Sequence, residues 1–121
     1  MPFENITFKN TNVHVSLKIN EYATQKIATL RKYVAPEVEA RAEVEFERVA
    51  SHKSGAVCRT EVNVFVAGTL YRAEATEETF EAAIDAARSQ LDQEMRKAHK
   101  KRTSLFRDGG RKIKEMMQFW G

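Results

Sequence analysis

The sequence predicts an α+β fold in the order β-α-β-β-β-α, with one four-stranded sheet and two helices packed on the same face. Four segments alternate between apolar and polar residues, and two others repeat apolar residues at helical spacing. The alternating segments each have a polar side, so both helices must cover the opposite, apolar face. With 121 residues, of which 42% are hydrophobic, the chain is long enough to bury a core.

The sequence marks the bounds of a short first strand and of the first helix. Residues 3–9 alternate and predict a strand, and residues 10–12 predict a turn. Ser16 is a good N-cap, and the helix should end just before Pro36, because the residue preceding a proline resists helical dihedral angles. The face of this helix that should be buried consists of Ile19, Ala23, Ile27, Leu30 and Val34.

Two further strands follow that helix. Residues 37–47 alternate strictly, with mostly glutamate on one side, which predicts a half-buried strand with a solvated outer face. Residues 51–55 form a polar loop, and residues 57–66 predict the next strand. Its inward side chains should be Cys58, Val62, Val64 and Val66.

A tight turn leads to the last strand. Ala67 and Gly68 supply this turn, because glycine tolerates a positive φ angle. Residues 70–75 then return as the third member of the meander. Its outer Arg72 and Glu74 can pair with the charged face of the neighbouring strand.

The second helix is expected within residues 76–102, and its charge changes sign along its length. Its apolar stripe consists of Phe80, Ile84, Ala87, Leu91 and Met95. Residues 76–94 contain six acids and one base, whereas residues 95–114 contain nine bases and one acid. Opposite charges at the two ends suit the helix dipole, but five bases within seven residues exceed what a helix end requires.

This segregated positive charge predicts a polyanionic partner, although the net charge of the whole chain is only +3. Nucleic acid is favoured over a membrane surface, because no strongly apolar face accompanies the basic run. The basic residues of the second helix are Arg88, Arg96, Lys97, Lys100, Lys101 and Arg102. Lys26, Arg31 and Lys32 would extend the same patch if the two helices lie side by side.

A solvated helix end is the simpler explanation of these bases, but it does not account for their alignment. Arg96, Lys97, Lys100 and Lys101 follow one ridge of the helix, where like charges repel unless an anion neutralises them. The fold shape is similar to that of double-stranded-RNA-binding domains. We therefore expect contacts to RNA phosphates and 2′-hydroxyls that read shape rather than sequence.

Signals for catalysis or metal binding are weak. His14, His52 and His99 have no second ligand at metal spacing, and Cys58 should be a small buried hydrophobe. The acids of residues 39–47 are better explained by a solvated strand face than by a catalytic pair. We expect no enzyme, no metal and no cofactor.

Residues 1–106 should form one domain, followed by a basic, amphipathic tail at residues 107–121. No segment resembles a signal peptide or a membrane span, and the single cysteine requires no oxidising compartment, so the cytoplasm is expected. The tail follows Gly109 and Gly110. Its apolar residues either dock on their own domain or bind a partner, and both alternatives stay open.

Three motifs resemble the ribosome hibernation-promoting factor family, also called ribosome-associated inhibitor A or sigma 54 modulation proteins. They are NITFKNTNVHVSLKINEYATQKIATLRKY, LYRAE and EAAIDAARSQLDQEMRKAHKK, and the last is the most specific. The resemblance covers roughly residues 5–102. Longer members have a second, carboxyl-terminal domain, so the resemblance is to the short form.

The resemblance implies a stress factor that sits in the mRNA and tRNA channel of the small ribosomal subunit and silences translation. It implies that Lys26, Lys97 and Lys101 contact 16S rRNA, as the corresponding family lysines do. Arg96, Lys100 and Arg102 are additional bases here, and Arg88 partly compensates where Gln90 and Gln93 replace common bases. The family's aromatic residue before "AAID" is displaced to Phe80.

We therefore expect a non-enzymatic protein that binds the small (30S) subunit rRNA, competes with mRNA and tRNA, and inhibits translation. No membrane or small-molecule substrate is expected. One alternative is a general double-stranded-RNA-binding module that reads shape. Another is a protein-interaction module that acts through its carboxyl-terminal tail.

Overall fold

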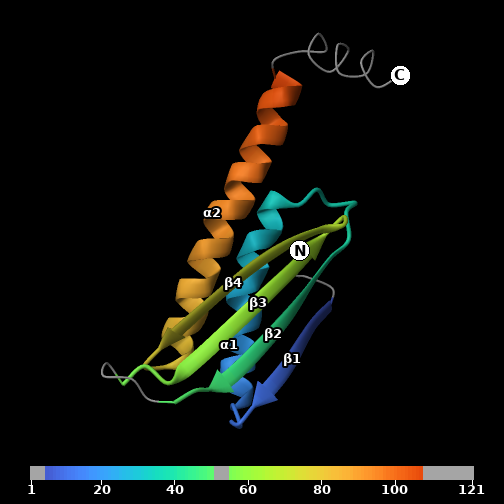
Figure 1. Cartoon of the computed structure of the whole chain (residues 1–121). Coiled ribbons are helices and arrows are strands. Elements are labelled where there is room, and N and C mark those ends of the chain that lie inside the picture. The colour runs from blue at the N-terminus through green and yellow to red at the C-terminus, as the bar shows by residue number, and fades with distance from the viewer. Residues whose placement is uncertain (1–4, 51–54, 108–121) are drawn as a thin grey trace.

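The elements of the computed structural model, which describes residues 5–50 and 55–107, follow the predicted order (Figure 1). The amino-terminal part contains strand β1 (Asn5–Thr11), helix α1 (Leu17–Ala28) and the short 3-10 helix η1 (Thr29–Tyr33). The rest consists of strands β2 (Ala40–Arg48), β3 (Cys58–Val66) and β4 (Thr69–Glu77), followed by the long helix α2 (Phe80–Arg107). The predicted α+β class is confirmed.

The four strands form one mixed sheet in the order β1-β2-β3-β4. β1 is parallel to β2, as a crossover through a helix requires, and the other neighbours are antiparallel hairpins. The β3–β4 turn has φ angles of 48° at Ala67 and 83° at Gly68. Two positive φ angles in a two-residue loop match the twist of the flanking strands, which fixes the pairing of Val66 with Thr69.

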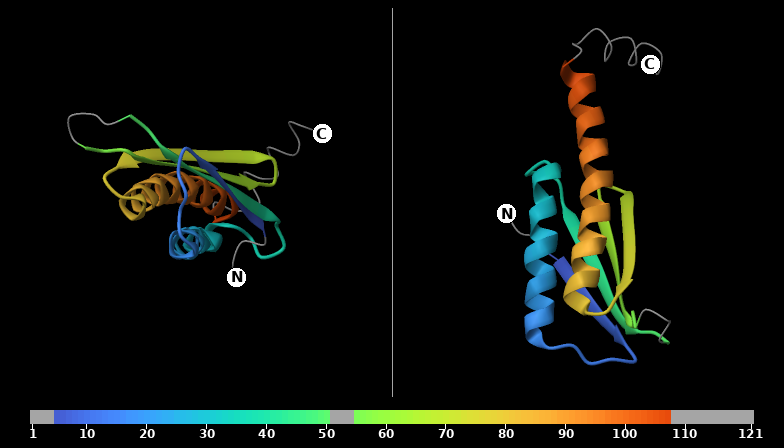
Figure 2. Two further views of the ribbon diagram at one scale, coloured as in Figure 1. Left: turned by 90° about the horizontal axis from the view of Figure 1, so that it is seen from below. Right: turned by 90° about the vertical axis from the view of Figure 1, so that its left-hand side faces the viewer.

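Both helices cover the same face of the sheet and lie side by side on it (Figure 2). The core fills the space between these two layers, where Phe46 stacks on Phe8 and meets the edge of Phe80. Its largest fully buried apolar side chains are Phe46, Ile27, Leu30, Ile84, Leu91, Val44 and Val64. Each such side chain contributes roughly 1.5–3 kcal/mol through removal of apolar surface from water.

Both helices begin at hydroxyl caps. The Ser16 side chain accepts a hydrogen bond from the backbone N–H of Ile19, as predicted. The Thr79 side chain accepts one from Ala82 at 3.1 Å, so it caps α2. Each hydroxyl satisfies one of the backbone donors that a helix start leaves unpaired. No helix in the described part of the chain combines the length and the apolar character needed to cross a membrane.

Several element boundaries differ from the sequence prediction. β1 continues to Thr11, because Thr11 still pairs with Glu47 of β2, and the turn begins at Asn12 with a φ of 59°. β4 continues to Glu77, so the first residues of the predicted helical stretch are strand. The predicted polar loop at residues 51–55 lies mostly outside the described residues.

Candidate nucleic-acid interface

The carboxyl-terminal end of α2 projects past the end of the sheet and past η1 (Figure 1). Before that end, Leu91 and Met95 face the core, with 1% and 2% of their surface exposed. Helical spacing therefore turns Lys97, Lys100 and Lys101 toward solvent, and all three are exposed. The sequence pattern that buries one face of this helix also presents its bases on the opposite side.

Four exposed bases of this segment have no counterion among the residues that the structure describes. Within residues 5–50 and 55–107, no carboxylate oxygen lies within 4.0 Å of a side-chain nitrogen of Arg96, Lys97, Lys100 or Lys101. We call these four residues the basic ridge. The shallow surface beside it is lined by Lys97, Lys100, Lys101, His99, Thr103 and Ser104, none of them acidic. A row of like charges without counterions attracts a polyanion.

Lys26 lies on α1 and Lys32 on η1, in the same helical layer as α2. The Lys26 ammonium nitrogen is 3.6 Å from an Asp85 carboxylate oxygen and lies over the Tyr22 ring. Asp85 also accepts a hydrogen bond from the Tyr22 hydroxyl at 2.8 Å, and this bond raises the pKa of Tyr22. Lys26 is thus partly neutralised within the fold.

Lys32 is exposed, and its ammonium group lies 5.2 Å from the centre of the Tyr33 ring. The Tyr33 hydroxyl donates to Asp92 at 2.8 Å, and burial together with this bond raises the Tyr33 pKa. Arg102 donates to the Tyr33 carbonyl oxygen at 3.1 Å while remaining exposed. Tyr33 therefore brings one base from η1 and one from α2 together.

Arg31 and Arg88 differ from the other predicted bases, because their guanidinium groups bind their own fold. Arg31 is only 9% exposed and donates to the Pro36 carbonyl oxygen at 3.1 Å. Arg88 donates to the Thr29 hydroxyl at 3.0 Å and lies 3.8 Å from Asp92. Of the nine bases predicted to bind RNA, these two are the least available in the structure, and the assignment of all nine stays a prediction.

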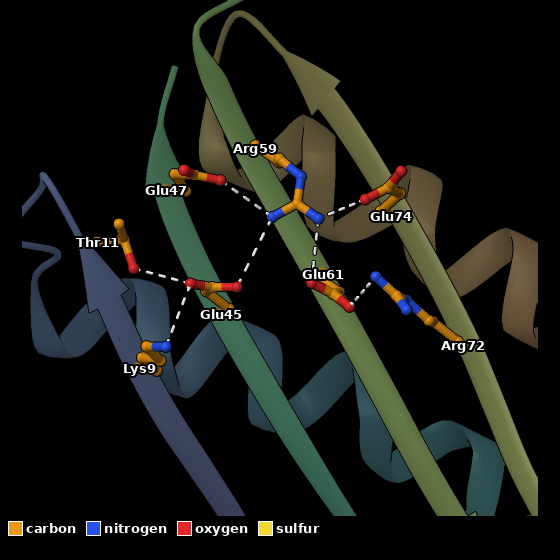
Figure 3. Close-up of polar contacts among 8 residues, drawn as sticks. All are labelled: Lys9, Thr11, Glu45, Glu47, Arg59, Glu61, Arg72 and Glu74. Atoms are coloured by element: carbon orange, nitrogen blue, oxygen red, sulfur yellow. Dashed lines mark hydrogen bonds and ion pairs between the residues drawn. The ribbon is translucent and has the colours of Figure 1, made fainter.

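The outer face of the sheet carries a second group of charges, only part of which was predictable from the sequence (Figure 3). Its centre is Arg59, whose side chain is 18% exposed. The Arg59 guanidinium pairs with Glu74, with Glu61 at 3.0 Å, with Glu47 at 3.1 Å and with Glu45 at 3.7 Å. We call these five residues the Arg59 cluster. The predicted pairing of β4 with its neighbour is confirmed.

The margins of the Arg59 cluster are also paired. Arg72 lies 2.7 Å from Glu61, and Lys9 lies 3.9 Å from Glu45, which also accepts a hydrogen bond from Thr11. Burial lowers the pKa of Arg59, but hydrogen bonds to Glu74 and Glu61 outweigh it and keep the guanidinium charged. The hydrogen bond from Arg59 in turn lowers the pKa of Glu74. One feature of the sequence indicated this cluster. Arg59 is a base on the outward side of its strand, and the neighbouring strand β2 has a row of glutamates on the same side.

The described residues also bear on the sequence expectations for metal ligands and for Cys58. No group of three or more histidine, cysteine, aspartate or glutamate side chains is arranged there to hold a metal ion. His52 and the tail beyond residue 107 lie outside the described residues. Cys58 is half-buried with its thiol 3.5 Å from the Glu78 carbonyl oxygen, and burial raises its pKa.

Comparison with known proteins agrees with this geometry. The model of the family described as "Sigma 54 modulation protein / S30EA ribosomal protein" matches residues 5–103. The crystal structure of the Thermus thermophilus Protein Y N-terminal domain is 25% identical to this chain, with a TM-score of 0.62. The match covers 80% of this chain and 98% of that one.

A second solved structure shares the fold. A ribosomal subunit interface protein from Coxiella burnetii has 18% identity and a TM-score of 0.60. The match covers 78% of this chain and 96% of that one. A comparison with curated protein sequences gave no match.

Proposed function

Because this chain belongs to the Sigma 54 modulation protein / S30EA ribosomal protein family, we propose that it binds the small ribosomal subunit and inhibits translation. Family membership indicates ribosome binding and translation regulation, and it confirms the resemblance to hibernation-promoting factors. The finer proposal is that the protein occupies the channel for mRNA and tRNA, on 16S rRNA of an idle ribosome. Its place of action would be the cytoplasm.

The observation that carries this proposal is the uncompensated basic ridge of α2. Lys97, Lys100 and Lys101 lack counterions in the described chain, whereas Arg59 is paired with four carboxylates. Phosphates supply the missing negative charge, and their condensed cations are released into solution on binding. The ridge therefore gains most from a partner with closely spaced phosphates.

Occupation of the channel would inhibit translation by steric competition, without any chemical step. Because α1 and η1 both contact α2 (Figure 2), Lys26 and Lys32 would extend the ridge into a broader basic face. Such a face suits folded RNA, because proteins recognise the shape of folded RNA through contacts with its backbone phosphates and 2′-hydroxyls. Bound protein and bound mRNA or tRNA would then exclude each other.

Sedimentation of the purified protein with isolated small subunits tests this proposal. We expect co-sedimentation with empty subunits and its loss when mRNA and initiator tRNA are bound first. If the protein co-sediments equally well with empty subunits and with subunits that carry mRNA and initiator tRNA, it binds elsewhere on the subunit. Equal binding to any folded RNA would instead support a general RNA-binding module.

A further inference from the structure

A hollow of about 670 Å³ lies between η1 and the loop after it, the tip of the β3–β4 hairpin, and α2. Its lining is mainly apolar, and we call the apolar residues Val34, Pro36, Val38, Val66 and Tyr71 its floor. We call Lys32, His99 and Arg102, which also line it, its polar rim, and no acidic residue of the described chain lines the hollow. The size falls within the range of about 300–1,000 Å³ that is usual for ligand pockets.

Tyr33 positions the two permanent charges of this rim. Lys32 lies over the Tyr33 ring, and Arg102 donates one N–H to the Tyr33 carbonyl oxygen. A guanidinium has five N–H donors, so this bond leaves Arg102 able to bind an anion as well. Tyr33 itself is anchored by its hydroxyl on Asp92 and by ring contact with His99. The two cations are thus held beside the apolar part of the hollow.

The hollow is continuous with the basic ridge. His99 and Thr103 line both the hollow and the shallow surface that contains Lys97, Lys100 and Lys101. A ligand in the hollow can therefore extend onto the ridge without crossing an acidic residue. A strand with several phosphates fits this arrangement better than a single small anion.

The ligand that matches an apolar floor, a cationic rim and an adjoining basic ridge is a nucleotide within a strand. We propose that this hollow takes one unpaired nucleotide of RNA, with its base on the apolar floor and its phosphate at Lys32 and Arg102. Only a base that has left its stack can enter, so the hollow selects single-stranded or bulged positions. This inference rests on the proposed function, since the ridge must bind the flanking phosphates.

Nuclear magnetic resonance titration of the full chain tests the inference with three probes. They are the trinucleotide of riboadenosine, adenosine 5′-monophosphate and ribose 5-phosphate. We expect the trinucleotide to bind most tightly, and ribose 5-phosphate about tenfold more weakly than the mononucleotide, because it lacks the base. Amide signals near Val38, Val66 and Thr103 should shift with both nucleotides.

A matched pair of variants links binding to the hollow. Ala35 is exposed and lines the hollow, so Ala35→Phe should fill it and weaken trinucleotide binding about tenfold. Ala50 is also exposed but lies outside the hollow, so Ala50→Phe should leave binding unchanged. Equal loss in both variants would overturn the assignment of the base to this hollow.

Three results would overturn the inference but would leave the proposed function unchanged. They are equal binding of ribose 5-phosphate and the mononucleotide, no shift near the hollow, and a mononucleotide that binds as tightly as the trinucleotide. The last result would indicate a free nucleotide as the ligand. In each case wild-type protein would still sediment with small subunits. If sedimentation fails while the trinucleotide binds in the hollow, the ribosomal part of the proposed function falls, and the part on which the inference rests, RNA binding by the ridge, is retained.

Discussion

The outer face of the sheet and the end of α2 are both rows of regularly spaced charges, yet among the described residues only the charges of the sheet are neutralised. On the sheet, Arg59 lies within 4.0 Å of Glu45, Glu47, Glu61 and Glu74. On α2, Lys97, Lys100 and Lys101 have no such partner among the residues that the structure describes. Charge density is therefore a poor guide to a binding surface, and charge compensation is a better one.

The difference follows from the geometry of the two elements. Neighbouring strands place residues of different segments about 5 Å apart, so an arginine on β3 can reach glutamates on β2 and β4. The projecting end of α2 has few neighbours, and its own acids lie farther toward its amino end. The sheet charges thus serve the fold, whereas those of the ridge are available to a partner.

The largest expected effect comes from removing the ridge. Replacing Lys97, Lys100 and Lys101 together with alanine should weaken binding to small subunits by about 100-fold at 0.1 M salt, since three phosphate contacts are lost. The slope of log K against log salt should fall by about two to three, at roughly 0.7–0.9 per contact. Sedimentation across a salt series measures both quantities, and alanine keeps the helix intact.

A control of equal charge comes from the sheet. Replacing Lys9, Arg41 and Arg72 with alanine also removes three exposed bases, but all three already pair with glutamates of the outer sheet face. Binding and its salt slope should therefore change little. Equal loss in both triple variants would mean that net charge, not the ridge, drives binding.

The next largest effect concerns stability. Arg59→Met leaves four carboxylates close together without their shared cation, which should lower the free energy of unfolding by about 2 kcal/mol. Urea unfolding at pH 7 measures this loss. Small-subunit binding by the folded variant should be unchanged, because Arg59 lies on the face opposite the helices.

The pH dependence of that loss tests its cause. The pKa of Glu74 is lowered in the folded state, mainly by its hydrogen bond from Arg59. Its stabilising contribution is thus present above the unfolded-state pKa, near 4, and disappears as pH falls through the folded value. The stability gap between wild type and Arg59→Met should narrow from pH 7 to pH 3. A gap of constant size would show that lost packing of the arginine stem, not charge, causes the effect.

The smallest expected effect comes from a substitution that removes the counterion of Lys26 and so makes this base available to a partner. Asp85→Asn removes the counterion of Lys26, so small-subunit binding should tighten by about threefold, the size of one surface ion pair. Glu21→Gln is the matched control, because Glu21 is exposed on the same helix as Lys26 and has no ion pair within the described residues. If the two variants bind alike, Lys26 is not part of the interface.

Much of this fold was predictable from residue periodicity. Alternation in residues 37–47 and 57–66, together with the turn at Ala67 and Gly68, indicated the hairpins that the structure contains. Boundaries were less predictable: β1 reaches Thr11 because β2 is there to pair with it. A strand ends where its partner ends, and no local pattern contains that information.

The candidate site was predictable in its location but not in its membership. Spacing alone placed Lys97, Lys100 and Lys101 on one exposed ridge. It could not distinguish them from Arg31, which is buried against the Pro36 carbonyl oxygen, or from Arg88, which binds Thr29. These contacts join different elements, so they exist only after folding.

The sequence by itself therefore determined the order of the elements, the apolar face of each and the segregation of positive charge, since all three are periodicities along one chain. Only the tertiary structure decided which charges are cancelled. Arg59 meets its glutamates across strands, and Lys32 and Arg102 meet around Tyr33. The physical reason is that ion pairs act over about 4 Å in space, and residues far apart in the chain reach that distance only through packing.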